Sequence, residues 1–132
     1  MGAGGGDRTM THRSRLAGII IDCQADDPHS GAAFWSAALG AEAMPAEDGS
    51  YVELTRQGGM NTEIQAVRHP SRVHLDIETD DVEAEVARLK SLGATEVVRI
   101  RTWVVMEAPT GHRFCVITAQ TPDFETRATT WP

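Results

Sequence analysis

The chain has 132 residues, the length of one domain with a hydrophobic core of its own. Its 19 acidic and 12 basic residues give a formal net charge of -7, which argues against nucleic acid and anionic membrane surfaces as partners. No apolar run approaches the roughly 20 residues of a membrane span, and the glycine-rich start lacks the apolar segment of a signal peptide. We therefore expect a cytoplasmic protein with a disordered leader over residues 1–14 and two reduced cysteines, Cys23 and Cys115.

The first half opens with a strand and a helix. Leu16–Cys23 is a continuous apolar run, which is typical of a central strand in a sheet. A polar turn follows, and Asp27 favours the start of a helix over residues 30–39. The spacing of apolar residues in that helix predicts that Phe34 and Leu39 face the core.

Short strands separated by turns complete the first half. Proline and paired glycines stand between them, as is usual for turns. Three strands in a row with short connections predict an antiparallel meander, and a proline-containing stretch over residues 68–71 then links to the second half. The expected strands cover residues 41–44, 51–54 and 62–67.

The second half begins with a strand over residues 73–78, in which apolar and polar side chains alternate. This period of two is typical of a half-buried strand. The apolar face consists of Val73, Leu75 and Ile77, and the polar face of His74, Asp76 and Glu78. Thr79 or Asp80 is expected to cap a helix over residues 81–92, which Gly93 ends. Further strands are expected over residues 95–100, 102–106 and 113–119.

The two halves follow one plan, since each reads strand, Asp-Asp, helix and Leu-Gly-Ala. Self-similarity of this kind predicts an internal repeat. We expect a single α+β domain over residues 15–120, built from two βαβββ modules of about 15–68 and 72–120 in a pseudo-twofold arrangement. Residues 121–132 are interpreted as a C-terminal tail.

Several short motifs occur in the same order as in a known superfamily. They are Asp27-Pro28 with Phe34-Trp35 and Leu39-Gly40, Arg72-Val73-His74-Leu75-Asp76, Leu92-Gly93-Ala94, and Pro109-Thr110-Gly111-His112-Arg113-Phe114-Cys115-Val116. On these motifs the chain resembles the vicinal oxygen chelate superfamily, and within it the compact glyoxalase-like domains related to glyoxalase I, extradiol dioxygenases and bleomycin resistance proteins. The resemblance implies a curled mixed sheet around a cavity, the glyoxalase/bleomycin resistance fold, in a homodimer.

In metal-dependent members of that superfamily, His, Gln or Glu side chains from the first and last strands of each half bind a divalent ion. Carried over by position, the resemblance places His74 at one such site and Cys115 where a glutamate is usual. The equivalent stretch of the first strand, residues 18–20, has no metal-binding side chain, while Gln65 or Glu63 falls in the remaining position. We therefore expect no cofactor; the alternative is a divalent metal (Zn, Ni, Fe or Mn) held by His74 and Gln65.

His74, Asp22 and Asp76 are candidates for acid-base chemistry. A histidine on the polar side of a central strand can act as a general base or bind a ligand; the alternative is a buried histidine satisfied by Asp76 or a strand neighbour. Asp22 and Asp76 occupy related positions in the two halves. Two carboxylates that face one cavity can shift each other's pKa, although they can equally cap helices or hydrogen-bond across the modules.

Trp35 and Trp103 are the aromatic residues best placed to line a cavity, where they would stack on a planar or cationic ligand. Core packing explains them as well. Cys115 stands at a metal-ligand position and so is expected to face the cavity, either as a thiol that His74 activates or as an inert buried one.

Two functions follow from these residues. One is a small-molecule-binding protein that lacks the full metal site and holds an organic, cationic ligand in an acidic cavity. The other is an enzyme that uses His74, either a metal-dependent lyase or isomerase of the glyoxalase type or a dioxygenase. The sequence leaves the choice between enzyme and binding protein open.

Overall fold

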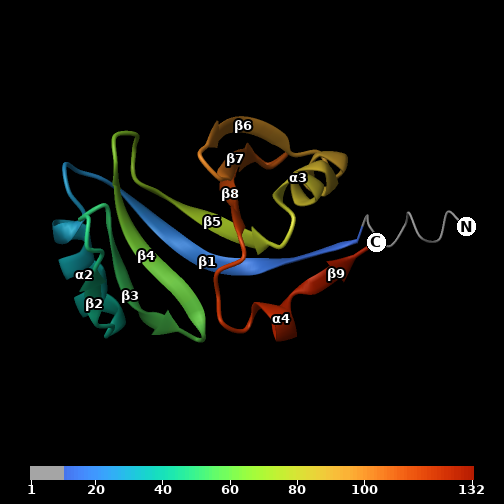
Figure 1. Ribbon diagram of the computed structural model, residues 1–132. Coiled ribbons are helices and arrows are strands. Elements are labelled where there is room, and N and C mark those ends of the chain that lie inside the picture. Colours follow the sequence, from blue (N-terminus) through green and yellow to red (C-terminus); the bar gives the residue numbers. More distant parts are fainter. Residues whose placement is uncertain (1–10) are drawn as a thin grey trace, which may run out of the picture. The chain divides into compact units, whose positions relative to one another are not determined.

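The structure is a computed structural model that describes residues 11–132. The chain divides into two compact units. The N-terminal unit is Gly18–Leu75; the C-terminal unit consists of Asp76–Pro132 together with the residues that precede Gly18. The elements in chain order are β1 (His12–Gln24), α2 (His29–Leu39), β2 (Ala43–Pro45), β3 (Tyr51–Gln57), β4 (Met60–Val67), β5 (Arg72–Thr79), α3 (Val82–Ser91), β6 (Thr95–Ile100), β7 (Trp103–Glu107), β8 (Arg113–Thr118), α4 (Phe124–Arg127) and β9 (Thr129–Trp131) (Figure 1). The α+β class predicted from the sequence is confirmed. No helix in the described residues is long and apolar enough to cross a membrane.

The N-terminal unit contains a mixed sheet with the strand order β2-β3-β4-β1. β1 and β4 run parallel, in a register that extends from Gly18 opposite Asn61 to Gln24 opposite Val67. β3 is antiparallel to both β4 and β2. The predicted strands over residues 51–54 and 62–67 lie within β3 and β4, whereas the one expected over residues 41–44 is found at Ala43–Pro45. The apolar run in β1 is explained by its place inside the sheet.

α2 packs on one face of this sheet, beside β2 and β3 (Figure 1). Ala32 is its buried residue and Trp35 packs one turn later, because side chains three positions apart share a helix face. Phe34 is 62% exposed and Leu39 is also exposed, so the prediction that they face the core is wrong for this chain. Ala32 and Trp35 occupy the sheet-facing side instead.

β5 alternates as predicted, but only Ile77 of its apolar face packs against a core. Val73 is 56% exposed and Leu75 is also exposed. On the polar face of this strand, Glu78 is buried and His74 is largely covered, and both side chains have hydrogen-bond partners. His74 bonds to Asp22, and Glu78 accepts hydrogen bonds from the backbone N–H groups of Gln120 and Thr121. Polar side chains that are satisfied can be buried at little cost.

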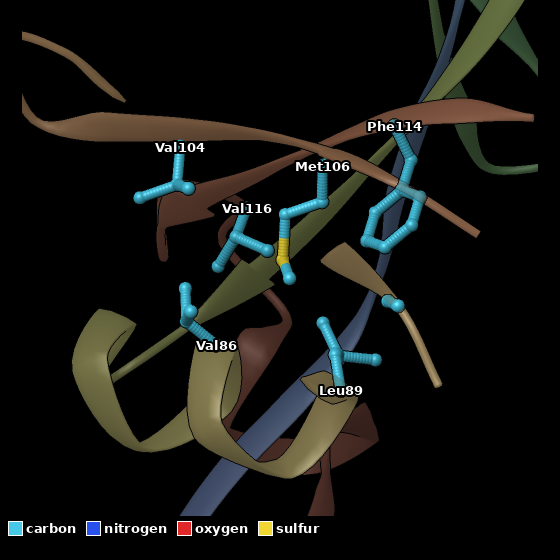
Figure 2. Close-up of a cluster of buried hydrophobic side chains, with 7 residues drawn as sticks. Val86, Leu89, Val104, Met106, Phe114 and Val116 are labelled. Carbon is cyan, nitrogen blue, oxygen red and sulfur yellow. The ribbon is translucent and has the colours of Figure 1, made fainter. Parts of the chain in front are cut away.

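The C-terminal unit contains the antiparallel meander β6-β7-β8, covered on one face by α3. Its core lies between the helix and the strands, where the side chains from α3, β7 and β8 point toward one another (Figure 2). The buried residues of this cluster are Val86, Leu89, Ala94, Val104, Met106, Phe114 and Val116. Their alternation along β7 and β8 leaves the other strand positions on the face away from α3.

The cap of α3 differs from the prediction. Asp81, not Thr79 or Asp80, is the N-cap residue, and its Oδ1 accepts a hydrogen bond from the Ala84 N–H at 3.0 Å. The Thr79 hydroxyl bonds to the Arg13 carbonyl instead. Asp81 thus fixes the first turn of α3, while Thr79 ties β5 to β1.

Both chain ends are more structured than the sequence suggests. Residues 1–10 of the expected leader lie outside the described residues, but His12–Ser14 form the start of β1 and pair with β9. The expected tail contains α4 and β9, and Phe124 is buried. The correction follows from Trp131, whose Nε1–H donates to the Ser14 hydroxyl at 2.8 Å.

Candidate functional site

The sheet of the N-terminal unit has two faces of different character. Val52 and Ile64 pack with α2 on one face, so the residues that alternate with them lie on the other. The register agrees, since Gln65 of β4 stands between Tyr51 of β3 and Asp22 of β1. We call this second surface the polar face; its polar residues are Asp22, Tyr51, Glu53, Asn61, Glu63, Gln65 and His74, and Gly18 and the buried Ile20 of β1 lie on it between them.

Asp22 and His74 form the buried pair of the polar face. His74 Nδ1 lies 2.6 Å from Asp22 Oδ2, and Asp22 is only 2% exposed. In its ionised form the Asp22 carboxylate can only accept, and His74 Nδ1 is then the donor of this bond. The other carboxylate oxygen, Oδ1, is buried and has no hydrogen-bond partner among the described residues. The pair thus fixes the imidazole and leaves one acceptor in need of a donor.

Two further carboxylates lie beside this pair. Glu53 and Glu63 are directly opposite each other on β3 and β4, and both are half-buried. Burial raises the pKa of the nearby Tyr51 phenol, and the charges of Glu63 and Glu53 raise it further. Tyr51 therefore stays protonated near neutral pH and can donate a hydrogen bond.

Gln65 and Trp35, two further predicted residues of the N-terminal unit, lie on opposite faces of its sheet. Gln65 is exposed on the polar face, in register with Asp22. Trp35 belongs to α2 on the opposite face, where its ring packs edge-to-face on Phe34 at 5.0 Å between centroids. The structure does not bring Trp35 to Asp22.

Three predicted residues belong to the C-terminal unit. Asp76 of β5 and Cys115 of β8 have ligand atoms within 4.8 Å of each other. Trp103 of β7 lies on the same face of the meander as Cys115, because Val105, two residues after Trp103, is the register partner of Cys115. This face is the one away from α3.

Sequence reasoning missed two residues of the polar face, Tyr51 and Asn61. Of the two, Asn61 is the buried one. It is 8% exposed, and its Oδ1 has no hydrogen-bond partner in the described part of the chain. Its register partner is Gly18, where an added Cβ would lie 2.9 Å from the Asn61 Cβ.

Residues 18–117 match the family of the glyoxalase-like domain, which is most of the chain. The chain belongs to the glyoxalase-like domain family. The resemblance to the vicinal oxygen chelate superfamily is thereby confirmed. No curated protein matches the sequence.

Solved structures with the same fold include proteins of different activities. Hypothetical protein BH1468 from Bacillus halodurans C-125 has a TM-score of 0.59 at 10% identity, over 82% of this chain and 96% of that one. Methylmalonyl-CoA epimerase in complex with methylmalonyl-CoA and NH4+ has a TM-score of 0.55 at 18% identity, over 83% of this chain and 96% of that one. 2,2',3-trihydroxybiphenyl 1,2-dioxygenase from Sphingomonas wittichii strain RW1 has a TM-score of 0.55 at 14% identity, over 83% of this chain and 42% of that one. At these identities the likeness shows the fold alone.

The metal set that the superfamily resemblance implies fits this chain in part. His74 supplies an imidazole, but the first-strand position is taken by Gly18 and Ile20, and Ile20 is buried and apolar. The glutamate position holds Cys115, whose thiol is a soft ligand that suits zinc better than magnesium or calcium. The side chains present therefore do not reproduce the hard-ligand set.

Proposed function

We propose that this glyoxalase-like protein binds an organic small molecule on its polar face, without the full metal set of the metal-dependent members of its superfamily. The observation that carries the proposal is the second oxygen of Asp22, which is buried and has no hydrogen-bond partner in the described residues. A buried carboxylate oxygen in this state costs free energy that a ligand N–H or O–H recovers.

The other groups of the face complete a binding site of defined chemistry. His74 holds the Asp22 carboxylate in one orientation through Nδ1. Gln65 and Tyr51 lie in the same cross-strand row and offer an amide and a hydroxyl. Such a site binds by hydrogen bonds and charge, which fix the position of a ligand.

A second function is favoured by one specific observation, the closeness of Asp76 and Cys115. His74 lies two residues before Asp76 on β5 and on the same face of that strand. Imidazole, carboxylate and thiolate together are zinc ligands, and a bound zinc ion would act as a Lewis acid toward a substrate carbonyl. In this alternative the protein is a metal-dependent lyase or isomerase of the glyoxalase type, or a dioxygenase that uses a redox-active ion.

We further propose that the protein acts in the cytoplasm as a homodimer, with neither nucleic acid nor membrane as partner. The superfamily resemblance and the net charge of -7 support this. Light scattering coupled to size-exclusion chromatography tests the assembly, and a monomer at micromolar concentration would contradict it.

A thermal-shift screen tests the proposed function. Wild-type protein is screened against a library of organic amines, alcohols and amides, and in parallel against divalent ions. We expect stabilisation by organic compounds that is lost in Asp22→Asn, which keeps the shape of the side chain and removes its charge. Stabilisation by a divalent ion that is lost in Cys115→Ser and kept in Asp22→Asn would instead establish the metal-dependent alternative.

A further inference from the structure

The polar face carries two buried acceptors, and they stand well apart. Asn61 Oδ1 and Asp22 Oδ1 are both buried and both without a hydrogen-bond partner among the described residues. Asn61 is in register with Gly18, and Asp22 lies four residues further along β1. At the rise of a β-strand this separation is about 13 Å. Each acceptor has lost water, so each is stabilised by a donor that a ligand brings.

Negative charge lies between the two acceptors. Glu63 is two residues after Asn61 on β4, and its register partner across β3 is Glu53. The raised pKa of Tyr51, caused by burial and then by Glu63 and Glu53, is consistent with negative potential on this face. An anionic ligand would be repelled here, whereas a cationic one is attracted along the whole length.

The acceptors and the charge together define the chemistry of the ligand. Resting on the proposed function, we propose that the ligand is an extended organic polyamine, with one ammonium group at Asp22 and a second N–H donor at Asn61. An ammonium group has three donors and no acceptor, so it complements a surface of carboxylate and amide oxygens. The carboxylates of Glu53 and Glu63 then lie beside the middle of the polyamine.

Length is the property that separates this ligand from a simple cation. A short diamine reaches Asp22 or Asn61, whereas a longer linear amine reaches both acceptors and also passes the two glutamates. We therefore expect spermidine to bind more tightly than putrescine, because each additional charge-assisted hydrogen bond increases the affinity about tenfold.

Isothermal titration calorimetry with spermidine and putrescine tests this proposal on the full chain at moderate salt. Glu53→Gln and Asn61→Ala are each expected to weaken spermidine binding about tenfold. Glu47→Gln, at an exposed position in the loop between β2 and β3, makes the same charge change away from the face and serves as the matched control. Circular dichroism verifies that each variant is folded.

The outcomes separate this inference from the function on which it rests. Equal loss of affinity in Glu47→Gln and Glu53→Gln would mean that spermidine is attracted by net charge alone, and would overturn the inference. So would equal affinity for spermidine and putrescine, or no affinity for either while another compound from the screen binds through Asp22. In the last case the proposed function stands; it fails if no compound from the screen depends on Asp22.

Discussion

Replacing Glu85 by Gln should destabilise the C-terminal unit strongly. Glu85 is on α3 and 0% exposed; its carboxylate accepts from His12 Nε2 at 2.7 Å and from Arg88 Nε and Nη2 at 2.9 Å each. Arg88 also lies over the Trp131 ring, 3.8 Å from its centroid. The carboxylate thus joins the first strand, the helix and the last strand. Breaking a buried pair of this kind costs about 3–5 kcal/mol, a large share of the 5–15 kcal/mol that is usual for a domain.

Urea denaturation followed by tryptophan fluorescence measures this loss. The matched control is Glu83→Gln on the same helix, where the side chain is 71% exposed and pairs with Arg99; it should change the free energy of unfolding far less. A loss below about 1 kcal/mol in Glu85→Gln would refute the reasoning, because that is the range of an exposed ion pair.

The same carboxylate predicts a pH dependence. Burial raises the pKa of Glu85, but hydrogen bonds from Arg88, His12 and Ser14 outweigh it and the pKa is lowered overall. Because the folded pKa lies below the unfolded one, the stabilisation is present above the unfolded pKa of about 4.3 and is lost as the pH falls through the folded value. Thermal unfolding from pH 7 to pH 3 should show the wild type and Glu85→Gln converge at the acid end; a constant difference would contradict this.

Three further substitutions have defined outcomes. Met106→Ala removes a fully buried side chain of the C-terminal core and should cost about 2–5 kcal/mol in urea denaturation; a loss below about 1 kcal/mol would contradict the packing in Figure 2. Gly18→Ala places a Cβ 2.9 Å from the Asn61 Cβ and should cost about 1–3 kcal/mol, whereas an unchanged denaturation midpoint would mean that β4 can move aside. Phe34→Ser alters an exposed ring and should leave stability within about 0.5 kcal/mol by the same assay, and a larger loss would mean that the ring is covered.

The positions of α2, α3 and most of the strands could be predicted because they depend on local patterns, whereas α4 and β9 were not predicted. The apolar run of β1, the alternation in β5 and the glycine after α3 each act within a few residues. Which face of β5 is buried depends instead on partners elsewhere in the chain, since His74 bonds to Asp22, 52 positions earlier. Periodicity identifies two faces of a strand but not the one that is covered.

Some residues of the candidate site could be predicted from the sequence, but the contacts between them could not. His74 and Asp22 were both named from the sequence, but their direct contact required the register of two strands that are far apart in the chain. Asn61 was missed because a single asparagine in a strand has no periodic signal, and its importance arises from burial without a partner. Trp35 was expected to line a cavity, but it lies on the sheet-facing side of α2 and packs against the core there.

The central claim is that this chain binds an organic ligand through Asp22 without the superfamily's metal set. The most direct test is the metal content of the purified, tag-free protein, measured by inductively coupled plasma mass spectrometry for wild type and His74→Ala. We expect substoichiometric metal in both proteins. One zinc, nickel, iron or manganese ion per chain in the wild type, lost in His74→Ala, would contradict the account and direct attention to metal-dependent lyase or dioxygenase chemistry.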